Sequence, residues 1–107
     1  MAVDEHLLDR VRAVLVGDGG VDGVEEKRMV GGRSFLRAGR LCCGVSGGGL
    51  VVRVGAAGMA SALAQPHVSA MTMRGRSLAA FVVVAPEGLA DDAELARWVR
   101  RGFASTD

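Results

Sequence analysis

Three short segments with a strand-like pattern, separated by very short glycine-containing connections, constrain the fold of this chain more than any other feature of its sequence. The segments are residues 34–37, 41–45 and 50–54, joined by Ala38-Gly39 and by residues 46–49. Connections this short cannot return the chain for parallel pairing, so consecutive segments must form antiparallel hairpins. The sequence therefore predicts a three-stranded antiparallel meander.

Amphipathic helices are predicted at both ends of the chain. Residues 3–15 carry apolar side chains at helical spacing, with charged residues on the other side. These apolar residues are Leu7, Leu8, Val11 and Leu15. In the last helix, Leu95 and Trp98 belong to an inward apolar stripe, and Asp91 with Glu94 fits a capping box at its start.

A short helix is predicted between the meander and the remaining strands. Residues 56–64 are rich in alanine and end just before Pro66, which disfavours helix at the residue that precedes it. Met59, Ala60 and Leu63 would lie on one face of this helix.

A β-hairpin is predicted after the short helix. Residues 70–73 and 78–84 flank the turn Arg74-Gly75-Arg76, and the end of the second arm is apolar on both faces, as in a buried central strand. The predicted order is helix, three-stranded meander, helix, β-hairpin and C-terminal helix. We expect an α+β fold in one domain, residues 1–107, with helices on one face of a mixed five-stranded sheet.

The composition favours a cytoplasmic protein. No apolar run approaches the roughly 18 residues that a membrane helix needs. Asp4 and Glu5 lie where a signal peptide would carry positive charge. The two cysteines, Cys42 and Cys43, are adjacent and cannot form a disulfide framework, which suits a reducing compartment. Because neighbouring strand residues alternate between faces, we expect one thiol to be buried and the other to face solvent or a second layer.

The net charge of +1 conceals a strongly uneven charge distribution. No acidic residue lies between Glu26 and Glu87, while the segments on either side are net negative. Two explanations are open: acidic helices pack beside a basic sheet, or the basic hairpins face a partner or an anion. The candidate residues for a partner or anion are Arg33, Arg37, Arg40, Arg74 and Arg76. Few aromatic residues accompany them, unlike the stacking surfaces of single-strand binders.

No catalytic, metal or cofactor site is predicted. Residues 44–48 match the Gly-x-Ser-x-Gly pattern around Ser46, but no acidic residue separates Ser46 from His67, the only later histidine, and a strand follows instead of a helix. A glycine-rich hairpin turn explains the motif better. The histidines and cysteines match no metal-binding spacing, and no phosphate-binding loop is present.

Several fragments, in their order and spacing, resemble the N-terminal domain of the TfoX family of competence regulators. The resemblance extends from Glu26 to Trp98. The fragments are residues 27–32, Phe35-Leu36, residues 42–45, residues 51–55, Gln65-Pro66-His67, residues 71–76, residues 81–84 and the segment from Gly88-Leu89 to Trp98. Val30 departs from the phenylalanine that is usual in the family. The family's separate C-terminal helical domain has no counterpart in this sequence.

The resemblance implies the same element order, in a fold akin to secretion chaperones that often dimerise. It also implies transcriptional regulation through a partner protein. We therefore expect a non-enzymatic regulatory or adaptor domain, as a homodimer with a regulatory protein partner. The alternative is a nucleic-acid or polyanion-binding module that uses the arginine-rich hairpins. An enzyme, a cofactor and a membrane location are not expected.

Overall fold

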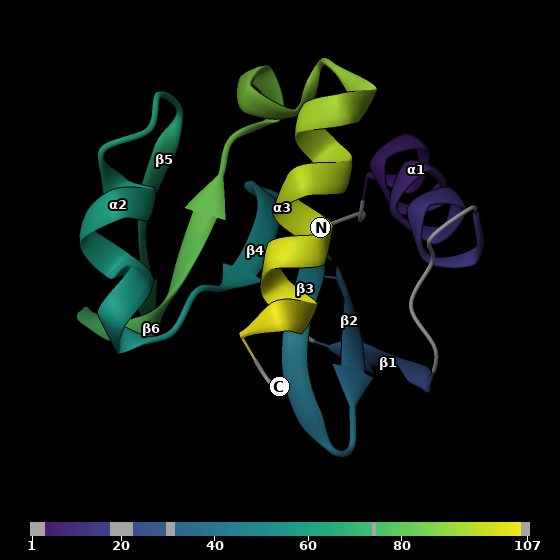
Figure 1. Cartoon of the computed structure of the whole chain (residues 1–107), viewed down its shortest axis with the longest axis horizontal. Helices are drawn as coiled ribbons and strands as arrows, with labels where there is room; N and C mark the ends of the chain where they lie inside the picture. The colour runs from purple at the N-terminus through teal and green to yellow at the C-terminus, as the bar shows by residue number, and fades with distance from the viewer. Residues whose placement is uncertain (1–3, 18–22, 30–31, 74, 106–107) are drawn as a thin grey trace.

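The structure, a computed structural model, describes residues 4–17, 23–29, 32–73 and 75–105. Within these residues, three α-helices, two short 3₁₀ helices and six strands follow one another, and Figure 1 shows their arrangement. In chain order they are α1 (Glu5–Val16), β1 (Val24–Met29), β2 (Gly32–Arg37), β3 (Arg40–Ser46), β4 (Gly49–Arg53), η1 (Ala56–Gly58), α2 (Met59–Leu63), β5 (Val68–Met73), β6 (Arg76–Val84), η2 (Pro86–Leu89) and α3 (Asp92–Ala104).

The strands form one sheet in the order β1-β2-β3-β4-β6-β5. Every neighbouring pair is antiparallel, so the expectation of a mixed sheet is wrong for the described strands. The predicted three-strand meander and the later hairpin are both present. The α+β class and the order of helices are confirmed.

A sixth strand, β1, is missing from the prediction of five strands. Four of its six residues are charged: Glu25, Glu26, Lys27 and Arg28. Such a segment has no alternation of apolar and polar residues, so nothing in its pattern marks it as a strand. Its place explains its composition, because β1 is an edge strand and edge strands commonly carry charge.

The apolar stripes of the two long helices are as predicted, and an aspartate caps each helix, although only the Asp91 cap was predicted. The Asp4 side chain accepts a hydrogen bond from Leu7 N at 3.1 Å, and Asp91 accepts one from Ala93 N at 2.9 Å. The predicted stripes of both helices are buried, and Trp98 is only 2% exposed. None of the described helices is long and apolar enough to cross a membrane.

The short helix α2 turns a different face inward from the one predicted. It contains five residues, after a 3₁₀ turn, and Ala62 is its buried residue. Ala60 is exposed and Leu63 is 41% exposed, while Met59 packs partly against the core. A helix of little more than one turn has too few positions for periodicity to identify its inner face, and here packing against β5 and β6 decides it.

Both cysteines are fully buried, which corrects the expectation that one would be turned away from the core. The β2–β3 register pairs Phe35 with Cys43 and Leu36 with Leu41, so the register shifts by one residue at Cys42. This is a β-bulge, and alternation between the two faces fails at a bulge. Burial raises the pKa of the Cys43 thiol.

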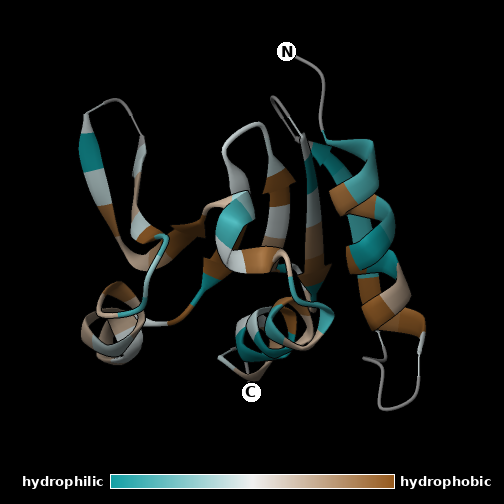
Figure 2. Ribbon diagram, turned by 90° about the horizontal axis from the view of Figure 1, so that it is seen from above, coloured by the Kyte–Doolittle hydropathy of each residue, from teal (hydrophilic) through white to brown (hydrophobic). Residues whose placement is uncertain are grey.

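The three helices lie on one face of the sheet. In Figure 1, α3 crosses in front of β3 and β4, and α2 lies in front of β5 and β6. Figure 2, turned by 90°, places α2 and α3 together below the strands, with α1 at the side. Among the described residues, no helix covers the other face, which we call the open face.

Candidate interaction surfaces

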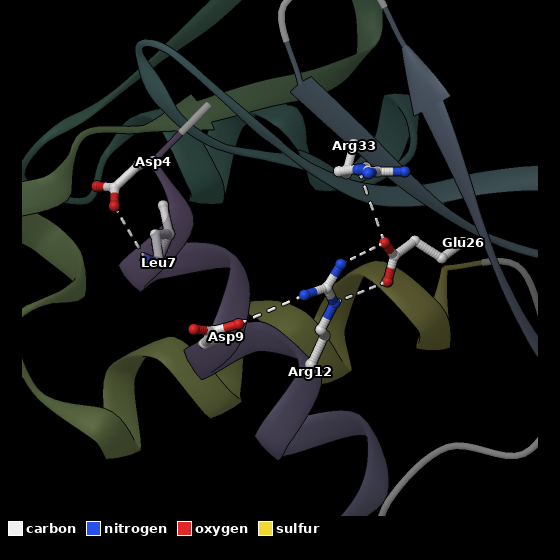
Figure 3. A network of polar contacts seen from close by, with 6 residues as sticks. All are labelled: Asp4, Leu7, Asp9, Arg12, Glu26 and Arg33. Carbon is white, nitrogen blue, oxygen red and sulfur yellow. Dashed lines mark hydrogen bonds and ion pairs between the residues drawn. The ribbon is translucent and has the colours of Figure 1, made fainter. Parts of the chain in front are cut away.

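Arg33 is held in an ion-pair network between β1, β2 and α1 (Figure 3). Its Nε lies 3.8 Å from Oε2 of Glu26 on the neighbouring strand. The same carboxylate accepts two hydrogen bonds from Arg12 of α1, at 3.0 Å from Nε and 2.7 Å from Nη2. Arg33 thus has a structural role on the helix-covered face.

The network controls the charge on Glu26. The hydrogen bonds from Arg12 are the largest cause that lowers the pKa of Glu26 from its ordinary value of 4.5. The positive charges of Arg12 and Arg33 lower it further, while partial burial opposes them. Conversely, Glu26 raises the pKa of Arg12. The pair therefore stays ionised and fixes α1 to the edge strand.

Arg37 and Arg40 lie directly opposite each other across the β2–β3 hairpin. Nη2 of Arg37 donates a hydrogen bond to the carbonyl oxygen of Phe103 at 2.8 Å, and its guanidinium lies 5.7 Å from the Phe103 ring centre. Arg40 is exposed at the start of β3. Like charges placed opposite each other destabilise a sheet, so this pair is a candidate anion contact.

The β5–β6 hairpin holds the remaining candidate arginines. Arg76 is exposed at the start of β6, and Arg74 lies outside the described residues. The antiparallel order puts this turn at the same end of the sheet as the β2–β3 turn, with β4 between the two hairpins. Arg33, which forms an ion pair with Glu26, does not lie at this end of the sheet. The structure therefore does not bring the candidate arginines into one cluster.

The open face carries a row of residues that the sequence prediction did not single out. Cross-strand pairing aligns Gly44 of β3, Val51 of β4 and Val83 of β6. Val51 is 1% exposed although it does not belong to the core cluster beneath the helices, and Val83 is half-buried. This face is therefore partly apolar without a covering helix.

Arg53 and Phe81 continue the open face as a cross-strand pair. The guanidinium of Arg53 stacks 4.8 Å from the centre of the Phe81 ring, and its Nε donates a hydrogen bond to Leu41 O at 2.6 Å. No local pattern in the sequence indicates this pair, because the two residues are distant in the chain and meet only through β4–β6 pairing.

An acidic hollow lies where β5 begins. Its volume is about 400 Å³. It is lined by Gln65, Pro66, His67, Glu87, Gly88, Ala90, Asp91, Glu94 and Trp98. His67 adopts a positive φ of 66°, and its carbonyl accepts a hydrogen bond from Ala85 N at 2.8 Å. Within the described part of the chain, no group of three or more histidine, cysteine, aspartate or glutamate residues could hold a metal ion.

Ser46 lies at a hairpin turn, as its glycine-rich surroundings predicted. It ends β3, and β4 follows at Gly49. The Ser46 hydroxyl donates a weak hydrogen bond to Gly49 O at 3.4 Å. The strand-to-helix turn of a hydrolase nucleophile is therefore not formed here.

A comparison with family models identifies the chain. The model of the TfoX N-terminal domain matches residues 19–105 of the 107 residues. This chain belongs to the TfoX N-terminal domain family. The resemblance noted in the sequence is confirmed. Comparison with curated proteins and with solved structures gives no significant match.

The part matched to the TfoX N-terminal domain includes all six strands and α3, but not α1. In this TfoX N-terminal domain, α1 nevertheless contributes Leu8 and Val11 to the core, and its Arg12 holds Glu26. Arg10 also joins α1 to the start of α3, with Nη2 2.9 Å from Asp92 Oδ1. The helix before the matched region is thus an integral part of the packing.

Proposed function

We propose that this TfoX N-terminal domain is a non-catalytic regulatory or adaptor module that acts through protein contacts. Membership of the family supports a regulatory role, since the TfoX resemblance implies regulation through a partner. The observation that carries the proposal is the open face. It is partly apolar, with the half-buried Val83 beside the fully buried Val51, and no described helix covers it.

The open face has the features of a protein contact surface. Val83 and Phe81 supply half-buried apolar area, and the guanidinium of Arg53 lies stacked on Phe81 beside them. Interfaces are enriched in aromatic residues and arginine around an apolar centre. A partner that covers Val83 would remove this apolar area from water.

The proposal can be tested in the source organism with a pair of matched substitutions. Val83→Glu places a charge on the open face, whereas Val16→Glu makes the same change at an exposed residue of α1. We expect Val83→Glu to change the same transcripts as deletion of the gene, and Val16→Glu to leave them unchanged. A wild-type transcript profile for Val83→Glu, at equal protein levels, would contradict the proposal.

Polyanion binding is the second candidate, and the opposed pair of Arg37 and Arg40 favours it. Arg40 is exposed, and Arg76 lies in the other hairpin at the same end of the sheet. This function requires binding to single- or double-stranded nucleic acid that weakens steeply with salt and is lost in the double variant Arg40→Ala with Arg76→Ala. Undiminished binding by that variant, or no binding at low salt, rules this candidate out.

A further inference from the structure

Arg53 places a positive charge in the middle of the open face. Strand pairing arranges the side chains of this face in rows that run across the sheet. The first row, from β2 to β6, is Ser34, Gly44, Val51 and Val83. The row beside it is Leu36, Leu41, Arg53 and Phe81. Arg53 is the charged member of these two rows.

The guanidinium group of Arg53 is fixed on two sides. Its Nε donates a hydrogen bond to Leu41 O at 2.6 Å, and its planar group stacks at 4.8 Å from the centre of the Phe81 ring. A side chain that is already held in one position loses little conformational entropy when it binds a ligand. Arg53 is therefore preorganised for a contact.

The two outer nitrogen atoms of Arg53 are available to a ligand. Within the described part of the chain, no hydrogen bond or ion pair involves Nη1 or Nη2, and the residue is partly exposed. The N–H groups of these two atoms form a planar fork that matches the two oxygens of a carboxylate. Because Nε is already engaged, this outer fork is the part of Arg53 that would bind the ligand.

The strands around Arg53 supply no carboxylate to balance its charge. Strands β3, β4 and β6 contain no acidic residue. Glu25 of β1 pairs with Leu36 on the open face, but three strand spacings of about 4.8 Å separate β1 from β4. Glu25 also lies 3.8 Å from Lys27, which balances it locally. The charge of Arg53 is therefore complementary to an acidic group from outside the chain.

Half-buried apolar side chains surround Arg53, and they indicate which acidic group fits. These are Leu36, Leu41, Phe81 and Val83. Protein interfaces often have an arginine at their energetic centre, within contacts that exclude water, and exclusion of water strengthens its ion pairs. Nucleic-acid interfaces are more polar and use several basic residues. A twofold contact between two copies would bring two Arg53 charges together.

We propose that Arg53 binds the carboxylate of an aspartate or glutamate on a different protein, whose apolar side chains cover Leu36, Leu41 and Val83. The outer fork of Arg53 donates two hydrogen bonds to the carboxylate, and the apolar contacts shield them from water. The proposal rests on the proposed function, because it names the chemistry of the partner at the open face.

Short random peptides displayed on phage supply a probe for this contact. Selection on the immobilised wild-type chain should enrich peptides in which apolar residues flank an aspartate or glutamate. Selection on Arg53→Gln should not enrich them. The matched control is Arg100→Gln, which changes an exposed arginine of α3 and should enrich the same peptides as the wild-type chain.

A double-mutant cycle with one selected peptide tests the contact itself. Replacing the acidic residue of the peptide by its amide should weaken binding to the wild-type chain at least about tenfold in fluorescence polarisation, because a charge-assisted hydrogen bond is lost. The amide peptide should bind the wild-type chain and Arg53→Gln with nearly equal affinity. A misfolded variant would lose the amide peptide as well, so the cycle separates loss of the contact from loss of the fold.

Several outcomes would overturn the carboxylate contact. They are enriched peptides without an acidic residue, no enrichment on the wild-type chain, and independent effects of the two changes in the cycle. A single-stranded oligonucleotide that binds at Arg53 more tightly than the peptide would identify a phosphate as the ligand and overturn the proposal as well. The transcript profile of Val83→Glu decides the proposed function separately, because it depends on the open face whatever group Arg53 binds.

Discussion

The ion pair between Arg12 and Glu26 shows how single residues fix the edge of this fold. Strand β1 contributes little apolar area, and Glu26 connects it to α1 through two hydrogen bonds and to β2 through Arg33. The Glu26 side chain is 27% exposed, so its interactions are partly shielded from water. Residue-scale electrostatics thus support an edge strand whose described contact with the hydrophobic core is Val24.

The lowered pKa of Glu26 predicts a pH-dependent contribution to stability. A carboxyl group with a folded-state pKa below its unfolded value stabilises the protein above the unfolded pKa, and this is lost as the pH falls through the folded pKa. Glu26→Gln should therefore lower the unfolding free energy by about 0.5–1 kcal/mol at pH 7. Urea titrations should show this difference shrink as the pH falls below 4.5 and vanish once Glu26 is protonated in the folded protein. A difference that is independent of pH would contradict the assignment.

Arg37 and Arg40 should differ in their effect on stability although they face each other. Arg37→Ala removes the hydrogen bond to Phe103 O and should cost about 1–2 kcal/mol. Arg40→Ala removes an exposed like charge and should change the unfolding free energy by less than about 0.5 kcal/mol. Thermal and chemical denaturation of the two variants measure these changes in unfolding free energy. Equal losses of unfolding free energy would show that Arg40 also stabilises the fold.

At the scale of elements, the sequence predicted the helices and strands that follow from periodicity and turn residues. It did not predict the features that depend on how strands pair. Both long helices, the meander and the second hairpin follow from local patterns. Strand β1 and the bulge at Cys42 depend on which strand lies alongside, and this leaves no local signature. The contact of Arg53 with Phe81 likewise arises from β4–β6 pairing. For the candidate site, the sequence identified the basic hairpins but not the open face.

The contact of α3 with the bulged part of β3 provides a test of packing between elements. A Cβ atom on Gly102 would lie 2.4 Å from the carbonyl oxygen of Cys42, so the helix backbone rests directly on the bulge. Gly102→Ala should destabilise the fold by about 1–3 kcal/mol. The matched control is Gly48→Ala, since no atom lies within 4 Å of a Cβ built there. Equal unfolding free energies for the two variants would contradict the close approach.

At the scale of the whole molecule, charge is arranged along elements rather than divided between acidic helices and a basic sheet. Helix α3 itself has Asp92 and Glu94 in its first turn and Arg101 in its last, an order that opposes the helix dipole favourably. The exposed basic hairpins lie at one end of the sheet, and the acidic hollow lies at the other end of β5. The molecule therefore carries basic residues at one end of its strands and acidic residues at the other. This favours contact with a surface whose charges are arranged in the opposite direction.

Affinity capture from the source cells, with nuclease present, tests most directly whether this domain acts through protein contacts at its open face. The immobilised wild-type chain and Val16→Glu should retain the same partner protein, and Val83→Glu should lose it. Retention of nucleic acid alone, abolished by nuclease and equal for all three chains, would contradict the account.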